Sequence, residues 1–305
     1  MDMQSKIQNP PWRHHFIPQF LLDEWATGGE LLRYYRDWRG DVHCEPKSPK
    51  GVCFGRDLYK TEGFPSEHAQ QMETIFMQRI DNAAANVHAR LLRGEVDALS
   101  DQECTEWARF IMSLIFRTPL DILGLREAVA LQAERARPLM EADGEGEELP
   151  PVAVQDLQMK ILRHAIDDHE RGSTLINMHW RVLKTSNSRE LWISDWPLDV
   201  PRKAAWLGDP SSYIGLPIAP DVWFVAAGTK SFADRLVARP QRELILTQNR
   251  ATVGHAQNFV GAKTPKAGQF IKANFGGLPR FSVTQSMAEK YRIADEATQE
   301  SASDE

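Results

Sequence analysis

The chain has little cysteine and no long apolar run. Three Cys among 305 residues cannot all pair within the chain, which argues against a secreted scaffold built on disulfides. No apolar stretch approaches the roughly 18 to 20 residues that cross a bilayer. Residues 1–11 contain one Lys and lack the apolar core of a signal peptide. We therefore expect a cytoplasmic protein with reduced cysteines and no association with a membrane.

Several familiar functional motifs are also missing. The sequence has no Gly-rich phosphate loop, no dinucleotide-binding fingerprint and no Gly-x-Ser-x-Gly elbow, so common nucleotide and serine-hydrolase machinery is disfavoured. It has no basic helix with interleaved aromatics of the kind that reads duplex DNA. It also shows no internal repeat of roughly 20 to 50 residues, which argues against a solenoid or a propeller.

The net charge of -6 is concentrated in two acidic stretches. Glu141–Glu148 and Ala294–Glu305 carry five acidic residues each and no basic one. Without these ten acids, the 36 basic residues exceed the remaining 32 acidic ones by four. Both stretches lack an apolar period, so we expect an acidic flexible linker over 141–151 and a disordered acidic tail over 294–305. The mildly basic body, 12–293, is compatible with a polyanionic substrate.

The hydrophobic pattern predicts an α+β fold in a single domain over 12–293. A small N-terminal hairpin is expected from 30–37 and 42–45, on either side of Arg39-Gly40-Asp41. A helical middle segment follows, with helices over 66–92, 101–118, 121–140 and 152–171. Ser100 and Glu103 form a capping-box pattern before the second of these helices.

The C-terminal half is expected to contain an antiparallel sheet. Alternation over 176–182, a turn signal and then 191–193 predict a hairpin, and 214–218 and 222–227 predict two further strands. The stretch 242–260 returns to a helical pattern.

The first candidate site residues lie near the chain start, in the segment 13–22. His15 and Gln19 flank Pro18 among Phe and Leu residues. An imidazole can ligate a metal or move protons, and an amide can hold an imidazole tautomer or position a substrate oxygen. The alternative is that both side chains satisfy backbone groups left unpaired around Pro18.

A second candidate, Asp195, follows the apolar run 191–193 directly and precedes Pro197 by two residues. Strand ends present carboxylates to metal ions or reacting groups. Asp195 could equally cap a turn, since an Asp before a bend bonds the backbone two residues further on.

Taken in order along the chain, these and other motifs resemble one family. They are His15-Phe16-Ile17-Pro18-Gln19-Phe20-Leu21-Leu22, a long helix bearing Glu73, Arg117-Thr118-Pro119, Ser194-Asp195-Trp196-Pro197, Leu216-Pro217-Ile218-Ala219-Pro220 and Asn249. The order is similar to that of the family of the domain of unknown function 4238, which occurs widely in bacteria and in some fungi. The resemblance implies no activity. It does imply that five polar residues belong to the family's pattern: His15, Gln19, Glu73, Asp195 and Asn249.

Two functions of different classes fit these residues. In the first, the protein is a metal-dependent hydrolase of the nuclease type: Glu73 and Asp195 hold Mg²⁺ or Mn²⁺, His15 activates water, and Gln19 and Asn249 position a nucleic acid read without sequence specificity. In the second, the same cluster grips a small ligand or peptide in a non-enzymatic binding module of a bacterial defence or stress pathway. Glu73 borders the apolar stripe of its helix, so it could also be a solvated glutamate paired with an Arg.

Overall fold

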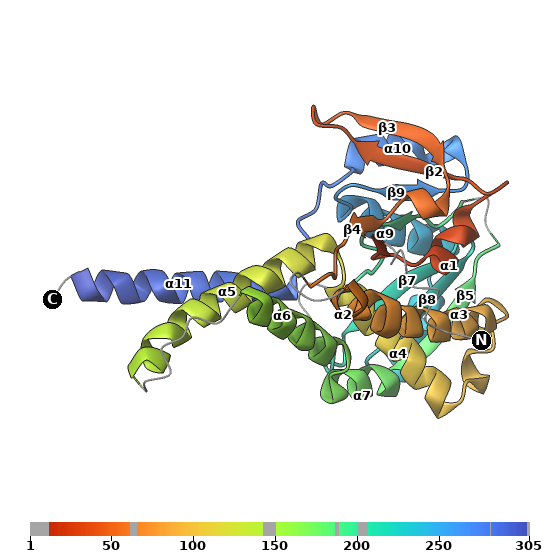
Figure 1. Cartoon of the computed structure of the whole chain (residues 1–305). Coiled ribbons are helices and arrows are strands. Elements are labelled where there is room, and N and C mark those ends of the chain that lie inside the picture. Colours follow the sequence, from red (N-terminus) through yellow and green to blue (C-terminus); the bar gives the residue numbers. More distant parts are fainter. Residues whose placement is uncertain are drawn as a thin grey trace, which may run out of the picture.

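The computed structural model describes residues 12–61, 66–142, 151–186, 189–200, 207–280 and 282–303. Figure 1 shows helices α3, α4 and α7 at one end of the molecule, the β2–β3 hairpin at the other, and the sheet of β5, β7 and β8 between them. Helices α5 and α11 extend to one side as an arm, with α6 beside them. The fold is α+β, as predicted.

The strands in the described ranges form three antiparallel sheets, ordered β1-β4, β3-β2-β9-β6 and β5-β8-β7. Their bounds are β1 Arg13–His15, β2 Leu31–Arg36, β3 Val42–Lys47, β4 Phe54–Arg56, β5 His179–Lys184, β6 Ile193–Ser194, β7 Tyr213–Ala219, β8 Val222–Ala227 and β9 Val260–Ala262. The β2–β3 pair is the predicted N-terminal hairpin. Its turn uses Gly40 at φ 91°, a left-handed conformation that glycine adopts without steric strain.

The α-helices are distributed along the whole chain. Their bounds are α1 Gln19–Leu22, α2 Ser66–Ala69, α3 Gln78–Leu92, α4 Asp101–Phe116, α5 Pro119–Ala142, α6 Pro151–Ile166, α7 His169–Asn177, α8 Lys230–Val237, α9 Gln241–Gly254, α10 Gly268–Asn274 and α11 Val283–Ser303. A π-helical segment, Met72–Met77, precedes α3. Short 3₁₀ helices lie at Asp23–Trp25, Pro49–Gly51, Val96–Ala98 and Pro265–Ala267. Among the described helices, none combines the length and the apolarity that crossing a membrane requires.

The largest hydrophobic cluster joins the helical middle to the sheet of β5, β7 and β8. Trp107 on α4 is fully buried, and its ring lies edge-on to Phe224 of β8 at 5.7 Å between centroids. Phe224 also meets Trp180 of β5 at 5.4 Å. The apolar face of the central helices therefore packs directly on the sheet, and these two layers bury each other's apolar side chains.

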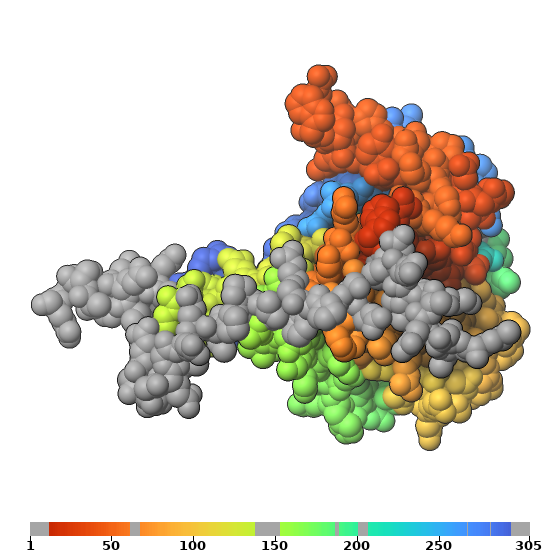
Figure 2. Space-filling view, viewed as in Figure 1, coloured from red at the N-terminus to blue at the C-terminus, as the bar shows by residue number. Residues whose placement is uncertain are grey.

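The two helices of the arm, α5 and α11, pack closely against each other. Gly124 on α5 has no side chain, and a Cβ there would lie 2.7 Å from the backbone nitrogen of Gln285 on α11. Asp121 of α5 accepts hydrogen bonds from Thr118, Arg280 and Ser282 just before α11 begins. In the space-filling view α5 projects sideways, well away from the orange β2–β3 hairpin (Figure 2).

Local sequence signals predicted several elements correctly. Helix α4 begins with the expected capping box, in which Ser100 accepts from the Glu103 backbone and the Glu103 side chain accepts from the Ser100 backbone. Strands β7 and β8 match the expected runs 214–218 and 222–227.

Other expectations differ from the structure. The helix expected over 152–171 is two helices, because the side chain of Asp168 accepts from the Arg171 backbone at 2.8 Å and starts α7 anew. The hairpin expected from 176–182 and 191–193 is wrong, since β5 pairs with β8 and β6 pairs with β9. The helical pattern over 242–260 ends at Gly254, and Val260 begins β9.

The two acidic stretches differ in how much of them the structure describes. Most of the expected linker 141–151 lies outside the described residues, which resume at Pro151 with α6. Of the expected tail 294–305, the part as far as Ser303 continues α11 as helix.

Candidate functional site

His15 and Gln19 are brought together at the junction of β1 and α1. Pro18 has extended backbone angles and precedes the first helical residue, Gln19, while Leu21 and Leu22 anchor the short helix in the core. The Gln19 amide nitrogen lies 3.4 Å from His15 Nδ1. An amide nitrogen is a donor, so this contact assigns the acceptor role to Nδ1 and the proton of the neutral ring to Nε2.

The environment of His15 keeps its ring neutral. Burial lowers the pKa of His15 to about 4, and the positive charges of Arg13 and Arg117 act in the same direction. The Lys50 backbone opposes this shift. The buried Nε2 atom has no hydrogen-bond partner within the described part of the chain. His15 thus presents an unused polar atom at neutral pH.

Glu73 lies in the π-helical segment, eight residues before Asp81 on α3. In an uninterrupted α-helix eight residues span roughly 800°, which would leave the two side chains roughly 80° apart. The wider π turn absorbs about one residue, which reduces the offset to roughly 20°. The π segment therefore turns Glu73 towards the same interior side as Asp81.

The carboxyl group of Glu73 is buried and holds its proton at neutral pH. Burial raises the pKa of Glu73 to about 8, the negative charge of Asp81 adds to the shift, and the positive charge of Arg117 opposes it. Its Oε2 atom has no hydrogen-bond partner among the residues that the structure describes. A carboxyl group with a pKa near neutrality is suited to proton transfer.

Arg117 lies between these two groups. It is the C-cap of α4 and is fully buried. Its Nε donates to the Phe16 carbonyl at 2.8 Å, directly after His15, and its Nη1 donates to Asp81 Oδ1 at 2.7 Å. Its Nη2 atom is buried and has no partner in the described ranges. We call His15, Gln19, Glu73, Asp81 and Arg117 the Arg117 cluster.

Contacts of Tyr59 with Arg117 and with His14 help to hold the cluster in position. The Tyr59 hydroxyl donates to the Arg117 carbonyl at 2.6 Å, and the Tyr59 backbone nitrogen donates to His14 Nδ1 at 3.0 Å. The His14 and Tyr59 rings are stacked. Strand β1 and the end of α4 are thereby held in one rigid arrangement around the guanidinium.

Asp195 occupies a different environment, where backbone amides use both carboxylate oxygens. Gln257 N donates to Oδ1 at 3.0 Å and Asn258 N donates to Oδ2 at 2.6 Å. Burial raises the pKa of Asp195 to about 6 in spite of these bonds and of the nearby positive charge of Arg280. Asp195 holds the loop between α9 and β9 against β6, a capping role that reaches about 60 residues along the chain rather than two.

Asn249 also bridges backbone segments. Its Oδ1 accepts from Trp192 N at 2.9 Å, and its Nδ2 donates to the Glu190 carbonyl at 2.8 Å. The amide thus ties α9 to the stretch that leads into β6. Within the described part of the chain, no hydrogen bond or ion pair joins Asp195 or Asn249 to the Arg117 cluster.

The structure therefore divides the five expected site residues. His15, Gln19 and Glu73 converge around Arg117, whereas Asp195 and Asn249 hold backbone elsewhere. Among the described residues, no three His, Cys, Asp or Glu side chains are arranged to hold a metal ion. The roles expected for Glu73 and Asp195 as ligands of one Mg²⁺ or Mn²⁺ stay predictions.

Sequence reasoning assigned no role to Arg117, although it noted the Arg-Thr-Pro motif. An Arg at the end of a helix normally interacts with the helix dipole in solvent, and nothing local distinguishes a buried one. One sequence feature could have indicated that Arg117 is buried: the apolar run Leu114-Ile115-Phe116 directly before it. Its partner Asp81 carried no signal, since it is a polar residue on a predicted amphipathic helix.

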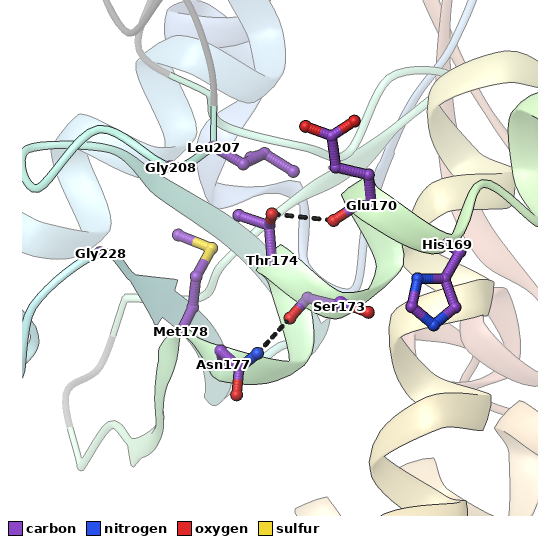
Figure 3. A pocket seen from close by; sticks show the side chains of 9 residues that line it. All are labelled: His169, Glu170, Ser173, Thr174, Asn177, Met178, Leu207, Gly208 and Gly228. Carbon is purple, nitrogen blue, oxygen red and sulfur yellow. Dashed lines mark hydrogen bonds between the residues drawn. The ribbon is translucent and has the colours of Figure 1, made fainter.

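A hollow of about 570 Å³ lies beside α7, and none of the expected site residues lines it. Figure 3 shows that its polar side chains bond their own helix: Thr174 donates to the Glu170 carbonyl and Asn177 to the Ser173 carbonyl. The His169 ring and the Glu170 carboxylate point in different directions. The Arg117 cluster, with convergent and unused polar atoms, is the stronger candidate site.

Comparison with known proteins gives one assignment. No curated protein and no solved structure shows significant similarity to the chain. A family model described as "Protein of unknown function (DUF4238)" matches residues 13–266, from the first residue of β1 to the 3₁₀ helix Pro265–Ala267 before α10. The match covers most of the chain and includes every member of the Arg117 cluster, so the chain belongs to this family.

Proposed function

We propose that the protein is a hydrolase whose reaction centre is the Arg117 cluster. One observation carries the proposal: three buried polar atoms from three different elements, His15 Nε2, Glu73 Oε2 and Arg117 Nη2, have no partner among the described residues. Leaving such atoms unsatisfied costs about 1 to 3 kcal/mol each. A substrate that supplied the missing partners would recover this free energy on binding.

The chemistry follows from the protonation states. Protonated Glu73 donates its proton to the leaving oxygen of an ester or phosphodiester as water adds to the electrophilic centre. The carboxylate that results takes up the proton released by that water, which restores the starting state. The guanidinium of Arg117 and the Nε2–H of neutral His15 stabilise the negative charge on the remaining oxygens. Gln19 fixes the His15 tautomer that makes Nε2 the donor.

Glu73→Gln tests the proposal. We expect hydrolysis of bis(p-nitrophenyl) phosphate, p-nitrophenyl acetate or single-stranded RNA or DNA by the wild type, and a loss of about 100-fold or more in the variant, because general acids contribute about 10² to 10⁴. Activity of the wild type should fall as pH rises through about 8, where Glu73 loses its proton. Glu134→Gln makes the same chemical change at an exposed position on α5 and should retain activity.

Two outcomes would contradict this reading. Full activity in Glu73→Gln would remove Glu73 from the reaction, and no turnover of any substrate by the wild type would leave the non-enzymatic binding module as the better interpretation. Assays with EDTA and with added Mn²⁺ test the metal-dependent form of the hypothesis. Restoration of activity by Mn²⁺ after EDTA treatment would support Glu73 as a ligand instead of an acid.

A further inference from the structure

A second hollow, of about 390 Å³, lies against the π-helical segment, and no member of the Arg117 cluster is among its lining residues. Met72, directly before Glu73, contributes to its wall. Helices α3, α4 and α6 supply four cations to its lining: Arg79, Arg109, Lys160 and Arg163. We call these four residues, with Met72 and Phe76, the arginine pocket.

The charges of the pocket are only partly compensated. Arg109 forms a two-pronged ion pair with Asp167, at 2.5 and 2.8 Å, and Lys160 pairs with Asp156 at 2.7 Å. Within the described part of the chain, Arg79 and Arg163 have no carboxylate partner. Positive charge therefore remains in a concave space, where it attracts anions more strongly than on a convex surface.

Phe76 orients two of the guanidinium groups. The Cζ atom of Arg109 lies 4.9 Å from the centroid of the Phe76 ring and that of Arg163 lies 5.2 Å from it. Stacking on an aromatic ring restricts a guanidinium without using its N–H groups. Arg163 is thus held in place with its donors free, which lowers the entropy lost when an anion binds.

From this arrangement we propose that the arginine pocket binds the phosphate group of a small phosphorylated ligand. Its volume lies within the range of about 300 to 1,000 Å³ found for small-molecule sites. Planar guanidinium groups bind phosphate oxygens through two parallel N–H donors. The site is distinct from the proposed reaction centre, although both use neighbouring residues of the π segment.

Calorimetric titration of the full chain at low salt, with pyrophosphate, 5′-AMP and adenosine as probes, tests the proposal. Pyrophosphate and 5′-AMP should bind and compete with each other, and adenosine should not bind, because it lacks the phosphate. Raising the salt concentration should weaken binding. Absence of binding by both phosphorylated probes at millimolar concentration would overturn the proposal, as would equal binding of adenosine.

Paired variants locate the binding. Arg79→Gln with Arg163→Gln should weaken pyrophosphate binding at least tenfold, since charge-assisted hydrogen bonds contribute about 1.5 to 3 kcal/mol and 1.4 kcal/mol is tenfold. Arg242→Gln with Arg250→Gln removes the same charge from the exposed side of α9 and should change binding by less than twofold. Equal losses in the two pairs would show a nonspecific charge effect and contradict the pocket.

Two single variants keep the test decisive. Arg79 is exposed, so Arg79→Gln alone should fold normally and weaken binding about threefold, even if the double variant is unstable. Unchanged binding in that folded variant would place the anion elsewhere. Glu73→Gln should bind pyrophosphate as the wild type does, so that failure of the hydrolase proposal and failure of the pocket give different results.

Discussion

At the scale of single residues, burial explains why Glu73 and His15 have opposite pKa shifts, because it disfavours the charged form of each group. The buried guanidinium disfavours a proton on His15 and favours an ionised Glu73, but desolvation of the Glu73 carboxyl outweighs the latter effect. Removing Arg117 would leave Asp81 without its ion-pair partner, and breaking a buried pair costs about 3 to 5 kcal/mol. Substitution of Arg117 therefore tests folding and is a poor test of function.

Asp195 gives a residue-scale prediction about stability. Asp195→Asn keeps the shape of the side chain but replaces one acceptor with an NH₂ group that faces a backbone N–H of Gln257 or Asn258. The lost hydrogen bond and the unsatisfied donor should lower the free energy of unfolding by about 1 to 3 kcal/mol. Urea unfolding at pH 7 measures this change.

Asp221→Asn is the matched control for Asp195→Asn, because Asp221 is exposed, and it should stay within about 0.5 kcal/mol of the wild type. A different result would favour the metal hypothesis: Asp195→Asn with unchanged stability but weakened Mn²⁺ binding. That pattern would mean that the Asp195 carboxylate binds a cation and contributes little to the stability of the loop between α9 and β9.

The same residues show how far a sequence can predict a site. Polar side chains at His15 and Glu73 stand out in apolar surroundings, so both were recognised as candidates. Asp195 looked equally promising, because a carboxylate after a strand has the same local pattern whether it meets a metal ion or two backbone amides. The deciding amides belong to Gln257 and Asn258, which no local pattern connects to Asp195.

At the scale of elements, the π-helical segment determines the direction of Glu73. Deletion of Thr74 puts Glu73 seven positions before Asp81, or roughly 700° of an ordinary α-helix, which keeps Glu73 within roughly 20° of Asp81. Insertion of one Ala after Gln78 instead rotates Glu73 by about 100°. We expect the deletion to keep the pKa of Glu73 near 8, and the insertion to move it towards the ordinary value.

Carboxyl ¹³C NMR titration reads these pKa values without any assay of activity. Circular dichroism shows whether each variant retains its helix content. If the deletion and the insertion change the pKa of Glu73 equally, the π segment is not what turns its side chain inward.

Elements were predicted where the signal is local and missed where it is not. The capping box at Ser100 and Glu103 is contained in four residues, and the β2–β3 hairpin joins two strands that follow each other directly in the sequence. The strands β5 and β6 were recognised in outline but given the wrong partners. Strand β5 pairs with β8, about 40 residues further along the chain. This pairing depends on the packing of β8 against α4, which cannot be read from the sequence of either strand alone.

At the scale of the whole molecule, burial of ionisable groups makes stability depend on pH in two opposing ways. The folded pKa of His15, about 4, lies below its ordinary value of 6.5, so stability rises with pH between these values. The folded pKa of Glu73, about 8, lies above its ordinary value of 4.5. Between these values the folded state keeps a proton that the unfolded state has lost, so stability falls as pH rises.

Comparison of Glu73→Gln with the wild type isolates the second effect, because His15 and Asp195 titrate alike in both proteins and cancel in the difference. The variant cannot ionise at this position, so its stability relative to the wild type should increase from pH 5 to pH 8.5. The increase should reach a few kcal/mol, since one pKa unit corresponds to about 1.4 kcal/mol. Urea unfolding at pH 5, 7 and 8.5 measures it, with Glu134→Gln as a control that should show no trend. If the difference in free energy of unfolding between Glu73→Gln and the wild type is constant across this range, Glu73 titrates as an exposed glutamate does. The proposed hydrolysis, which needs a buried and protonated Glu73, would then be contradicted.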